Sequence, residues 1–223
     1  MNQSGAVSIT ALKTFPLFAG LSEDVLISIS QAAAMRRFPR GQVVVRIGEV
    51  CDFVYIILTG SLKVAVCDDS GREAILSVLG QGEVFGEMGM FDDQVRSASV
   101  VAITATDLVM ISRQEFRLLM QEHFDISWRM MCSLAQRLRK ADRKIESLAL
   151  MDVYGRVVGL LIEMSEDVAG KRVVKTRISK QDIARMIGAS REMVSRVMKD
   201  IVQQGQIEET QDGIVLSDHL AEF

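Results

Sequence analysis

A short segment in the first half of the chain combines glycine, a carboxylate and an arginine in an arrangement suited to binding a sugar phosphate. It begins Phe85-Gly-Glu-Met-Gly and, after an acidic loop, continues Arg96-Ser-Ala. Gly86 lets the backbone approach a ligand closely, because it has no side chain. Arg96 can pair with a phosphate, and Glu87 can accept hydrogen bonds from sugar hydroxyls. Backbone N–H groups of residues 86–90 can also face an anion.

The same spacing also fits a purely structural loop. In that alternative, a salt bridge between Glu87 and Arg96 braces a connection between strands, and no ligand is involved. The residue types and their spacing leave the binding loop and the braced loop equally open.

A second segment, residues 179–199, predicts a helix–turn–helix. Two short amphipathic patterns flank Gly188-Ala-Ser190, where glycine permits the backbone of a tight turn. Ser179 can cap the first helix and Ser190 the second. The apolar residues expected to face inward are Ile183, Ala184, Ile187, Val194, Val197 and Met198.

The second of these helices presents Arg191, Glu192 and Arg196 near its start, on one outward face. Arginine can bond guanine through two donors, and glutamate can accept from the amino group of cytosine. Lysine and arginine outnumber acidic residues over residues 171–199, which suits contact with DNA phosphates. The alternative is an ordinary solvated helix hairpin, but the turn, the caps and the basic bias together favour a DNA reader.

The stretch from Asp125 to Met151 must connect these two segments, and it contains neither Gly nor Pro. Its apolar residues recur at spacings of three and four, which is typical of a two-stranded coiled coil. The seam residues are Met131, Leu134, Leu138, Ala141, Ile145 and Leu148. A helix lying on its own core is the alternative, but such a helix usually has a wider apolar stripe. A dimer formed through this seam is therefore expected.

The rest of the chain predicts an α+β protein. Short β-rich runs with glycine at the turns favour an antiparallel roll or sandwich over alternating βαβ units. These runs are Gln42–Ile47, Phe53–Leu58, Ser61–Val66, Glu73–Leu79, Ser97–Ala102 and Thr106–Ile111. Short helices are expected within residues 9–38, and a longer one over 153–167 precedes a strand in 171–177. Ser112 is the expected N-cap of a helix over 113–122, with Glu115 completing a capping box.

The composition excludes several classes of protein. The chain has 223 residues, 48% of them apolar, and a net charge of −3, which suits one large or two modest globular domains. Cys51, Cys67 and Cys132 lie far apart and only two histidines are present, so no metal site is expected. Unpaired thiols and the lack of a long apolar run predict a cytoplasmic protein without a membrane span. No Walker-type loop, nucleophile elbow or metal triad occurs, so no enzyme activity is expected.

Over residues 12–218, the chain resembles the CRP/FNR (catabolite activator) family of bacterial transcription regulators. Phe85-Gly-Glu-Met-Gly with Arg96-Ser-Ala98 looks like the phosphate-binding cassette of that family. Ser190-Arg-Glu-Met-Val-Ser-Arg196 looks like its recognition helix, and Leu148-Ala-Leu-Met-Asp-Val-Tyr-Gly155 is similar to its hinge.

The resemblance implies three consecutive parts. Residues 1–124 would form an antiparallel, jelly-roll-like β-roll that binds a cyclic nucleotide. Residues 125–151 would form the dimerisation helix and hinge, and residues 152–223 a winged helix–turn–helix domain that binds DNA.

For the effector, the resemblance implies contacts with the ribose, the cyclic phosphate and the base. The implied set is Gly86, Glu87, Met88, Arg96, Ser97, Ala98, Ala141 and Asp142. Eight residues separate Glu87 from Arg96, a spacing similar to that in the cyclic-nucleotide domains of eukaryotic kinases. Ala141 and Asp142 stand where the cAMP-binding activator has a Thr–Ser pair that contacts adenine. The intact cassette makes cAMP the first candidate effector. Cyclic di-GMP is the second, because some relatives use it and the adenine-contacting pair is absent here, and no small ligand is the third.

For DNA, the resemblance implies that Arg191, Glu192 and Arg196 read a TGTGA-like half-site of a palindrome. The residues implied to contact phosphates are Ser179, Gln181, Ser190 and Lys199. The family is homodimeric, with the central helix as the dimer seam, and RNA polymerase is the further partner it implies. The loop at residues 168–172 looks shorter than the polymerase-contacting loop of the best-known member, so the polymerase contact is not assigned.

Overall fold

The computed structural model describes residues 5–175, 178–210, 213–217 and 220. The chain divides into two compact units, Met1–Arg137 and Leu138–Phe223. The division lies inside a continuous helix, α5 (Phe124–Leu150), so this helix belongs to both units. The three-part division expected from the sequence stays a prediction, since it cuts the chain at other positions.

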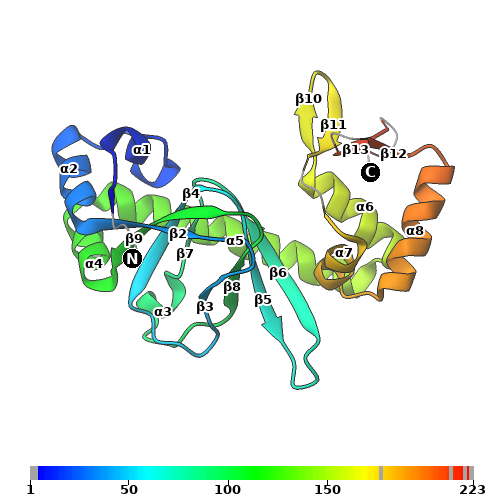
Figure 1. The fold of residues 1–223 in the computed structure, drawn as a ribbon, viewed down its shortest axis with the longest axis horizontal. Helices are drawn as coiled ribbons and strands as arrows, with labels where there is room; N and C mark the ends of the chain where they lie inside the picture. Colours follow the sequence, from blue (N-terminus) through cyan, green and yellow to red (C-terminus); the bar gives the residue numbers. More distant parts are fainter. Residues whose placement is uncertain (1–4, 176–177, 211–212, 218–219, 221–223) are drawn as a thin grey trace. The chain divides into compact units, whose positions relative to one another are not determined.

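Two antiparallel sheets form the β-roll of the first unit (Figure 1). One sheet has the order β1-β2-β9-β4-β7 and the other β3-β8-β5-β6. Their strands are β1 (Gly5–Ala6), β2 (Ala33–Phe38), β3 (Val43–Val45), β4 (Phe53–Thr59), β5 (Leu62–Cys67), β6 (Glu73–Leu79), β7 (Val84–Phe85), β8 (Ser99–Ala102) and β9 (Thr106–Ser112). The α+β class and the antiparallel roll are confirmed, although the strand expected from Ser97 begins at Ser99.

The central strand β4 shows why its sequence is an unbroken apolar run. Val54 and Ile56 contribute to one hydrophobic core, whereas Tyr55 and Ile57 contribute to the other. Successive side chains of a strand point to opposite faces of the sheet, and β4 is buried on both faces. The strand thus separates a core shared with the helices from a core between the two sheets.

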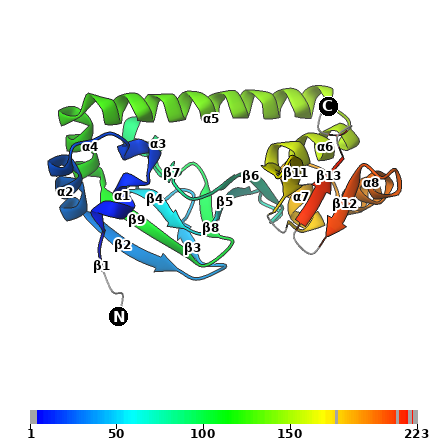
Figure 2. The same cartoon turned by 90° about the horizontal axis from the view of Figure 1, so that it is seen from above.

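Helices α1 (Ile9–Lys13), α2 (Glu23–Ala32) and α4 (Arg113–Glu122) gather at one end of the β-roll (Figure 2). Their buried side chains belong to the same core as β4, and a short 3₁₀ helix, η1 (Pro16–Phe18), adds to it. The Ser112 hydroxyl accepts from the Glu115 amide at 3.2 Å, which confirms Ser112 as the N-cap of α4.

The prediction of helix throughout residues 9–38 is wrong at its end, because residues 33–38 form strand β2. This segment is rich in alanine and arginine, which are good helix formers, and no Gly or Pro interrupts it. Pairing with β9, from Ala33 opposite Ile111 to Phe38 opposite Thr106, overrides that local preference. Residue Phe38 buries its side chain in the core between the sheets.

The second unit packs three helices beside a small antiparallel sheet. The helices are α6 (Val153–Met164), α7 (Lys180–Ile187) and α8 (Arg191–Gln203), and the sheet has the order β10-β11-β13-β12. Its strands are β10 (Glu166–Val168), β11 (Lys171–Val174), β12 (Ile207–Thr210) and β13 (Gly213–Leu216). The hairpin β12–β13 is the wing that the family resemblance implied.

The helix predicted over residues 153–167 ends earlier, at Met164. The Ser165 hydroxyl donates to the Ile162 carbonyl at 2.8 Å, and Glu166–Val168 pairs with β11 instead of continuing the helix. The strand expected in 171–177 is present up to Val174, and its last two residues lie outside the described residues. No helix among residues 5–175, 178–210 and 213–217 is both long and apolar enough to cross a membrane.

Candidate nucleotide site and nucleic-acid interface

The side chain of Arg96 lies inside the first unit, with only 6% of its surface exposed. Its guanidinium donates to the carbonyls of Gly86 at 2.6 Å and Phe53 at 2.7 Å. Gly86 has a φ of +83°, and a Cβ at this position would overlap the guanidinium and lie 3.2 Å from the Phe53 carbonyl oxygen. A residue other than glycine would therefore displace Arg96.

The positive charge of Arg96 has no carboxylate partner within the described part of the chain. Its Nε atom is buried without a hydrogen-bond partner. The Tyr55 ring lies 5.6 Å from the guanidinium carbon and gives some cation–π stabilisation, and Tyr55 in turn stacks on Phe85 at 4.9 Å. A buried cation is unfavourable unless an anion compensates it, so this site is prepared for an anion.

The carboxylate of Glu87 is the second buried charge of the site, with 1% exposure. Its Oε1 accepts from Arg137 at 2.6 Å, and Arg137 also donates to the Val84 carbonyl. The other oxygen, Oε2, is buried without a partner. The Glu87–Arg96 salt bridge that the braced-loop alternative required is therefore absent here, and Arg137 on α5 holds Glu87 instead.

Arg137 is the residue of this site that the sequence did not reveal. It is one of several charged residues along the outer faces of the central stretch, and nothing in the heptad pattern distinguishes it. It lies fifty positions after Glu87 in the sequence. Only the packing of α5 against the β-roll brings the two side chains together.

The short helix α3 (Met88–Phe91) begins directly after Glu87 and shapes the loop that follows. The amides of Met90 and Phe91 donate to the Glu87 carbonyl at 3.0 and 3.3 Å. The Met90 amide is therefore not one of the backbone N–H groups of residues 86–90 that could face an anion.

The remaining cassette residues differ in exposure. Met88 and Ser97 are exposed, and Ala98 is buried. Beneath the loop, the Cys51 thiol donates to the Gly86 carbonyl at 2.9 Å, and burial raises the pKa of this thiol. Cys51 thus supports the cassette as a neutral side chain. Ala141 and Asp142, which belong to the second unit, are exposed on α5, and their role in binding a base stays a prediction.

In the second unit, the two expected caps of the helix–turn–helix are confirmed. The Ser179 hydroxyl accepts from the Asp182 amide at 3.1 Å, and the Ser190 hydroxyl from the Met193 amide at 3.2 Å. Gly188 ends α7 with a φ of +66°, a conformation that favours glycine. Arg156 on α6 donates to the Ile187 carbonyl at 2.7 Å and fixes the end of α7 against α6.

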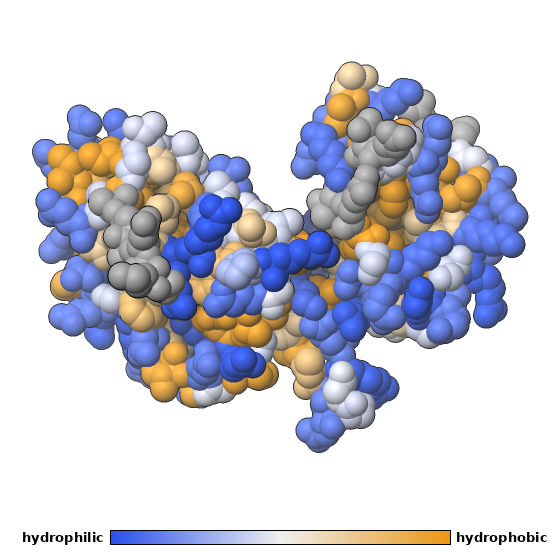
Figure 3. Space-filling view, in the orientation of Figure 1, coloured by the Kyte–Doolittle hydropathy of each residue, from blue (hydrophilic) through white to orange (hydrophobic). Residues whose placement is uncertain are grey.

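Helix α8 turns one apolar face inward and one charged face outward. Val194, Met198 and Ile201 are buried, whereas Arg191, Glu192 and Arg196 are exposed. The exposed residues line a shallow hollow together with Ser195, which the sequence patterns did not single out. The surface over α8 is largely hydrophilic (Figure 3).

The charges on α8 are suited to reading base edges. The backbone amide of Glu192 and the Ser190 hydroxyl hydrogen-bond the Glu192 carboxyl and lower its pKa, so it stays an acceptor at neutral pH. The residues expected to contact phosphates, Ser179, Gln181, Ser190 and Lys199, are all exposed. Their contacts with DNA stay a prediction.

Along α5, most of the large seam side chains are exposed to solvent in the single chain. Leu138 and Ile145 are 63% and 64% exposed, and Met131 and Leu148 are each 48% exposed. Leu134 differs, because it packs partly against the core of the first unit. A row of exposed apolar side chains on one helix is typical of an interaction surface.

The fold and the two sites define a ligand-binding β-roll joined to a helix–turn–helix DNA reader. Residues 35–123 match the family model described as a cyclic nucleotide-binding domain, and residues 155–221 match the Crp-like helix-turn-helix domain. The chain belongs to the CRP/FNR family of transcription regulators.

Individual relatives agree with this assignment. The chain is 35% identical over 179 residues to the cAMP-activated global transcriptional regulator Vfr of Pseudomonas aeruginosa, covering 77% of this chain and 84% of Vfr. It is 30% identical over 206 residues to the CRP-like cAMP-activated regulator of Mycobacterium tuberculosis, covering 91% and 92%. Among solved structures, the c-di-GMP responsive global regulator CLP of Xanthomonas campestris superposes with a TM-score of 0.72 at 28% identity, over 87% of this chain and 99% of CLP.

We expect Arg137→Gln to lower the free energy of unfolding by about 3 kcal/mol, because the Glu87 carboxylate would stay buried without its cation. The double variant Glu87→Gln, Arg137→Gln should recover most of this loss, since no uncompensated charge remains. Urea denaturation followed by circular dichroism measures both. The control Arg139→Gln, on an exposed part of α5, should change stability by less than about 0.5 kcal/mol. Equal losses for Arg137→Gln and Arg139→Gln would contradict the pairing.

Proposed function

We propose that the protein is a homodimeric, sequence-specific transcription regulator whose DNA binding is controlled by a cyclic nucleotide. The β-roll binds the effector, the seam of α5 joins two copies, and α8 of each copy enters a major groove. A ligand can control DNA binding only if it prefers one of two conformations of the dimer. The effector would therefore favour the arrangement that spaces two recognition helices one DNA turn apart. We expect it to act in the cytoplasm, as its unpaired thiols predict, together with RNA polymerase, the partner that the family resemblance implies.

The observation that carries the sensor half is a pair of unsatisfied buried atoms. Glu87 Oε2 is an acceptor and Arg96 Nε a charged donor, and neither has a partner within the described residues. Buried polar groups are almost always hydrogen-bonded, so such atoms point to a missing ligand. A cyclic nucleotide supplies both complements: its ribose hydroxyl donates to Glu87, and its cyclic phosphate accepts from Arg96. Gly86, Met88, Ser97 and Ala98 would complete the contact surface.

We take cAMP as the first candidate effector, because Vfr and the mycobacterial relative are named as cAMP-activated. Cyclic di-GMP is the second candidate, since the structural neighbour CLP is named as responsive to it. Ala141 and Asp142 are the positions at which the base would be recognised. Alanine offers no side-chain hydrogen bond and aspartate offers only acceptors, so Asp142 would accept from an amino or imino group of a purine.

In the DNA-binding half, Arg191, Glu192 and Arg196 would read the bases of a TGTGA-like half-site. Their exposure on one face of α8, and the caps at the starts of α7 and α8, support this assignment. Ser179, Gln181, Ser190 and Lys199 would hold the phosphates and so fix the register of the helix on the duplex. The function of the protein would then be regulation and not catalysis.

Replacing Arg96 with Ala should weaken binding of cAMP by about 100-fold or more, because the phosphate charge loses its buried partner. Isothermal titration calorimetry with cAMP, cGMP and cyclic di-GMP measures this and ranks the effectors. The control Arg40→Ala removes an exposed arginine from the same unit and should leave affinity unchanged. If none of the three nucleotides binds with a Kd below about 100 μM, the sensor half of the proposal fails.

The double variant Arg191→Ala, Arg196→Ala should bind a TGTGA palindrome roughly 100-fold more weakly, since each good base contact is worth about 1–3 kcal/mol. A gel-shift titration at fixed salt measures the affinity. The variant Lys13→Ala, Arg40→Ala removes the same charge from the first unit and serves as the control. Equal affinity of both double variants would argue against base readout by α8.

The double variant Leu138→Glu, Ile145→Glu should be a monomer at concentrations where the parent protein is a dimer, because four like charges would then meet in the seam. Sedimentation velocity gives the oligomeric state directly. Lys140→Glu with Arg143→Glu places the same new side chains on α5 outside the seam and should leave the dimer intact. A dimer that persists in the seam variant would place the interface elsewhere.

A further inference from the structure

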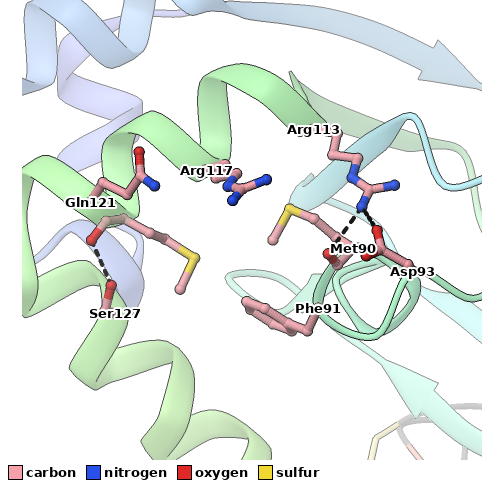
Figure 4. A pocket seen from close by; sticks show the side chains of 8 residues that line it. Met90, Phe91, Asp93, Arg113, Arg117, Gln121 and Ser127 are labelled. Carbon is pink, nitrogen blue, oxygen red and sulfur yellow. Dashed lines mark hydrogen bonds and ion pairs between the residues drawn. The ribbon is translucent and has the colours of Figure 1, made fainter.

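A hollow of about 390 Å³ lies on the first unit between α3, α4 and the first turns of α5 (Figure 4). Met90, Phe91 and Met120 form its apolar wall, and its polar groups come from Asp93, Arg113, Arg117, Gln121 and Ser127. None of these side chains belongs to the predicted nucleotide, DNA or seam residues. The volume lies within the range of roughly 300–1,000 Å³ typical of small-molecule sites.

The lining of the hollow carries two positive charges, Arg113 and Arg117, against one negative charge, Asp93, so a net positive charge remains at Arg117. Arg113 pairs with Asp93, whose side chain is 80% exposed, and an exposed ion pair is weakly stabilising. Arg117 follows one helical turn later, and within the described residues no carboxylate or hydrogen-bond acceptor contacts it. Like charges four residues apart on a helix repel each other. An anion between them would remove this repulsion.

The apolar wall lies opposite the cationic side. Figure 4 shows the Phe91 ring across the hollow from Arg117, with Met90 between them. Phe91 is 45% exposed, so its ring is accessible to an occupant of the hollow. Methionine side chains adapt their shape to an occupant. At the end of the hollow formed by α5, the Ser127 hydroxyl donates to the Met120 carbonyl at 2.7 Å and so joins α5 to α4.

We propose that this hollow binds a small organic anion with an apolar body, such as a medium-chain carboxylate. Arg117 and Arg113 would bind the acidic group, and Phe91, Met90 and Met120 would cover the apolar part. A bare inorganic anion would leave the apolar wall exposed, and a neutral apolar molecule would leave Arg117 uncompensated. The site shares no lining side chain with Glu87 and Arg96, so the proposal does not depend on a nucleotide.

Isothermal titration calorimetry of the full-length protein tests the proposal with three carboxylate or phosphate probes: octanoate, 4-phenylbutyrate and octyl phosphate. At least one should bind with a Kd below about 1 mM. Octan-1-ol, which has the same chain without the charge, and inorganic phosphate, which has the charge without the chain, should each bind at least about tenfold more weakly than the matching probe. Failure of all three probes to bind, or equal binding of octan-1-ol and octanoate, would overturn the proposal.

Variants locate the binding in the hollow. Arg117 is exposed, so the Arg117→Gln variant should fold normally. It should bind the best probe about tenfold or more weakly, whereas Arg117→Lys should retain most of the affinity. Phe91→Ala should weaken binding of the probe, because the apolar contact with the ring is lost. Arg40→Gln makes the same charge change elsewhere on the first unit and should bind the probe as the parent does. Equal affinities for Arg117→Gln and Arg40→Gln would show that the probe binds elsewhere and would reject this site.

Discussion

A buried arginine without a carboxylate beside it is the constraint that organises the sensor half of this protein. The guanidinium of Arg96 satisfies two of its donors with the carbonyls of Gly86 and Phe53, and its Nε keeps no partner among the described residues. The glycine that precedes Glu87 makes room for this side chain, because a Cβ there would overlap the guanidinium. Arg96 is buried, and the low dielectric of the protein interior strengthens any interaction with an anion. A folded chain that keeps such a charge unpaired is preorganised for a ligand.

The pair Glu87–Arg137 extends that constraint to the long helix. Arg137 binds both the carboxylate of Glu87 and the carbonyl of Val84, so the register of α5 on the β-roll is fixed by hydrogen bonds as well as by apolar packing. Only one oxygen of Glu87 is used, and the other remains available to a ligand. A ligand that binds Oε2 would therefore contact the same carboxylate that holds α5. This is a direct physical route from an occupied pocket to the helix that carries the seam.

Local motifs were predictable from the sequence, and contacts between distant segments were not. The caps Ser112, Ser179 and Ser190 were assigned correctly, because a cap depends on residues within one helical turn. The strand β2 was predicted wrongly as helix, since only its pairing with β9 decides its conformation. Arg137 was missed for the same reason, and the braced-loop alternative assigned Glu87 the wrong partner. The family resemblance supplied the wing, whose short strands have no strong pattern of their own.

We infer that Glu87 Oε2 and Arg96 Nε lack partners within the protein because a cyclic nucleotide supplies them. A crystal structure of the protein with cAMP tests this most directly. We expect a phosphate oxygen within about 3.2 Å of Arg96 Nε and a ribose hydroxyl within about 3.2 Å of Glu87 Oε2, with the Glu87–Arg137 pair intact. A nucleotide bound elsewhere, with both atoms still unpaired, would contradict the account.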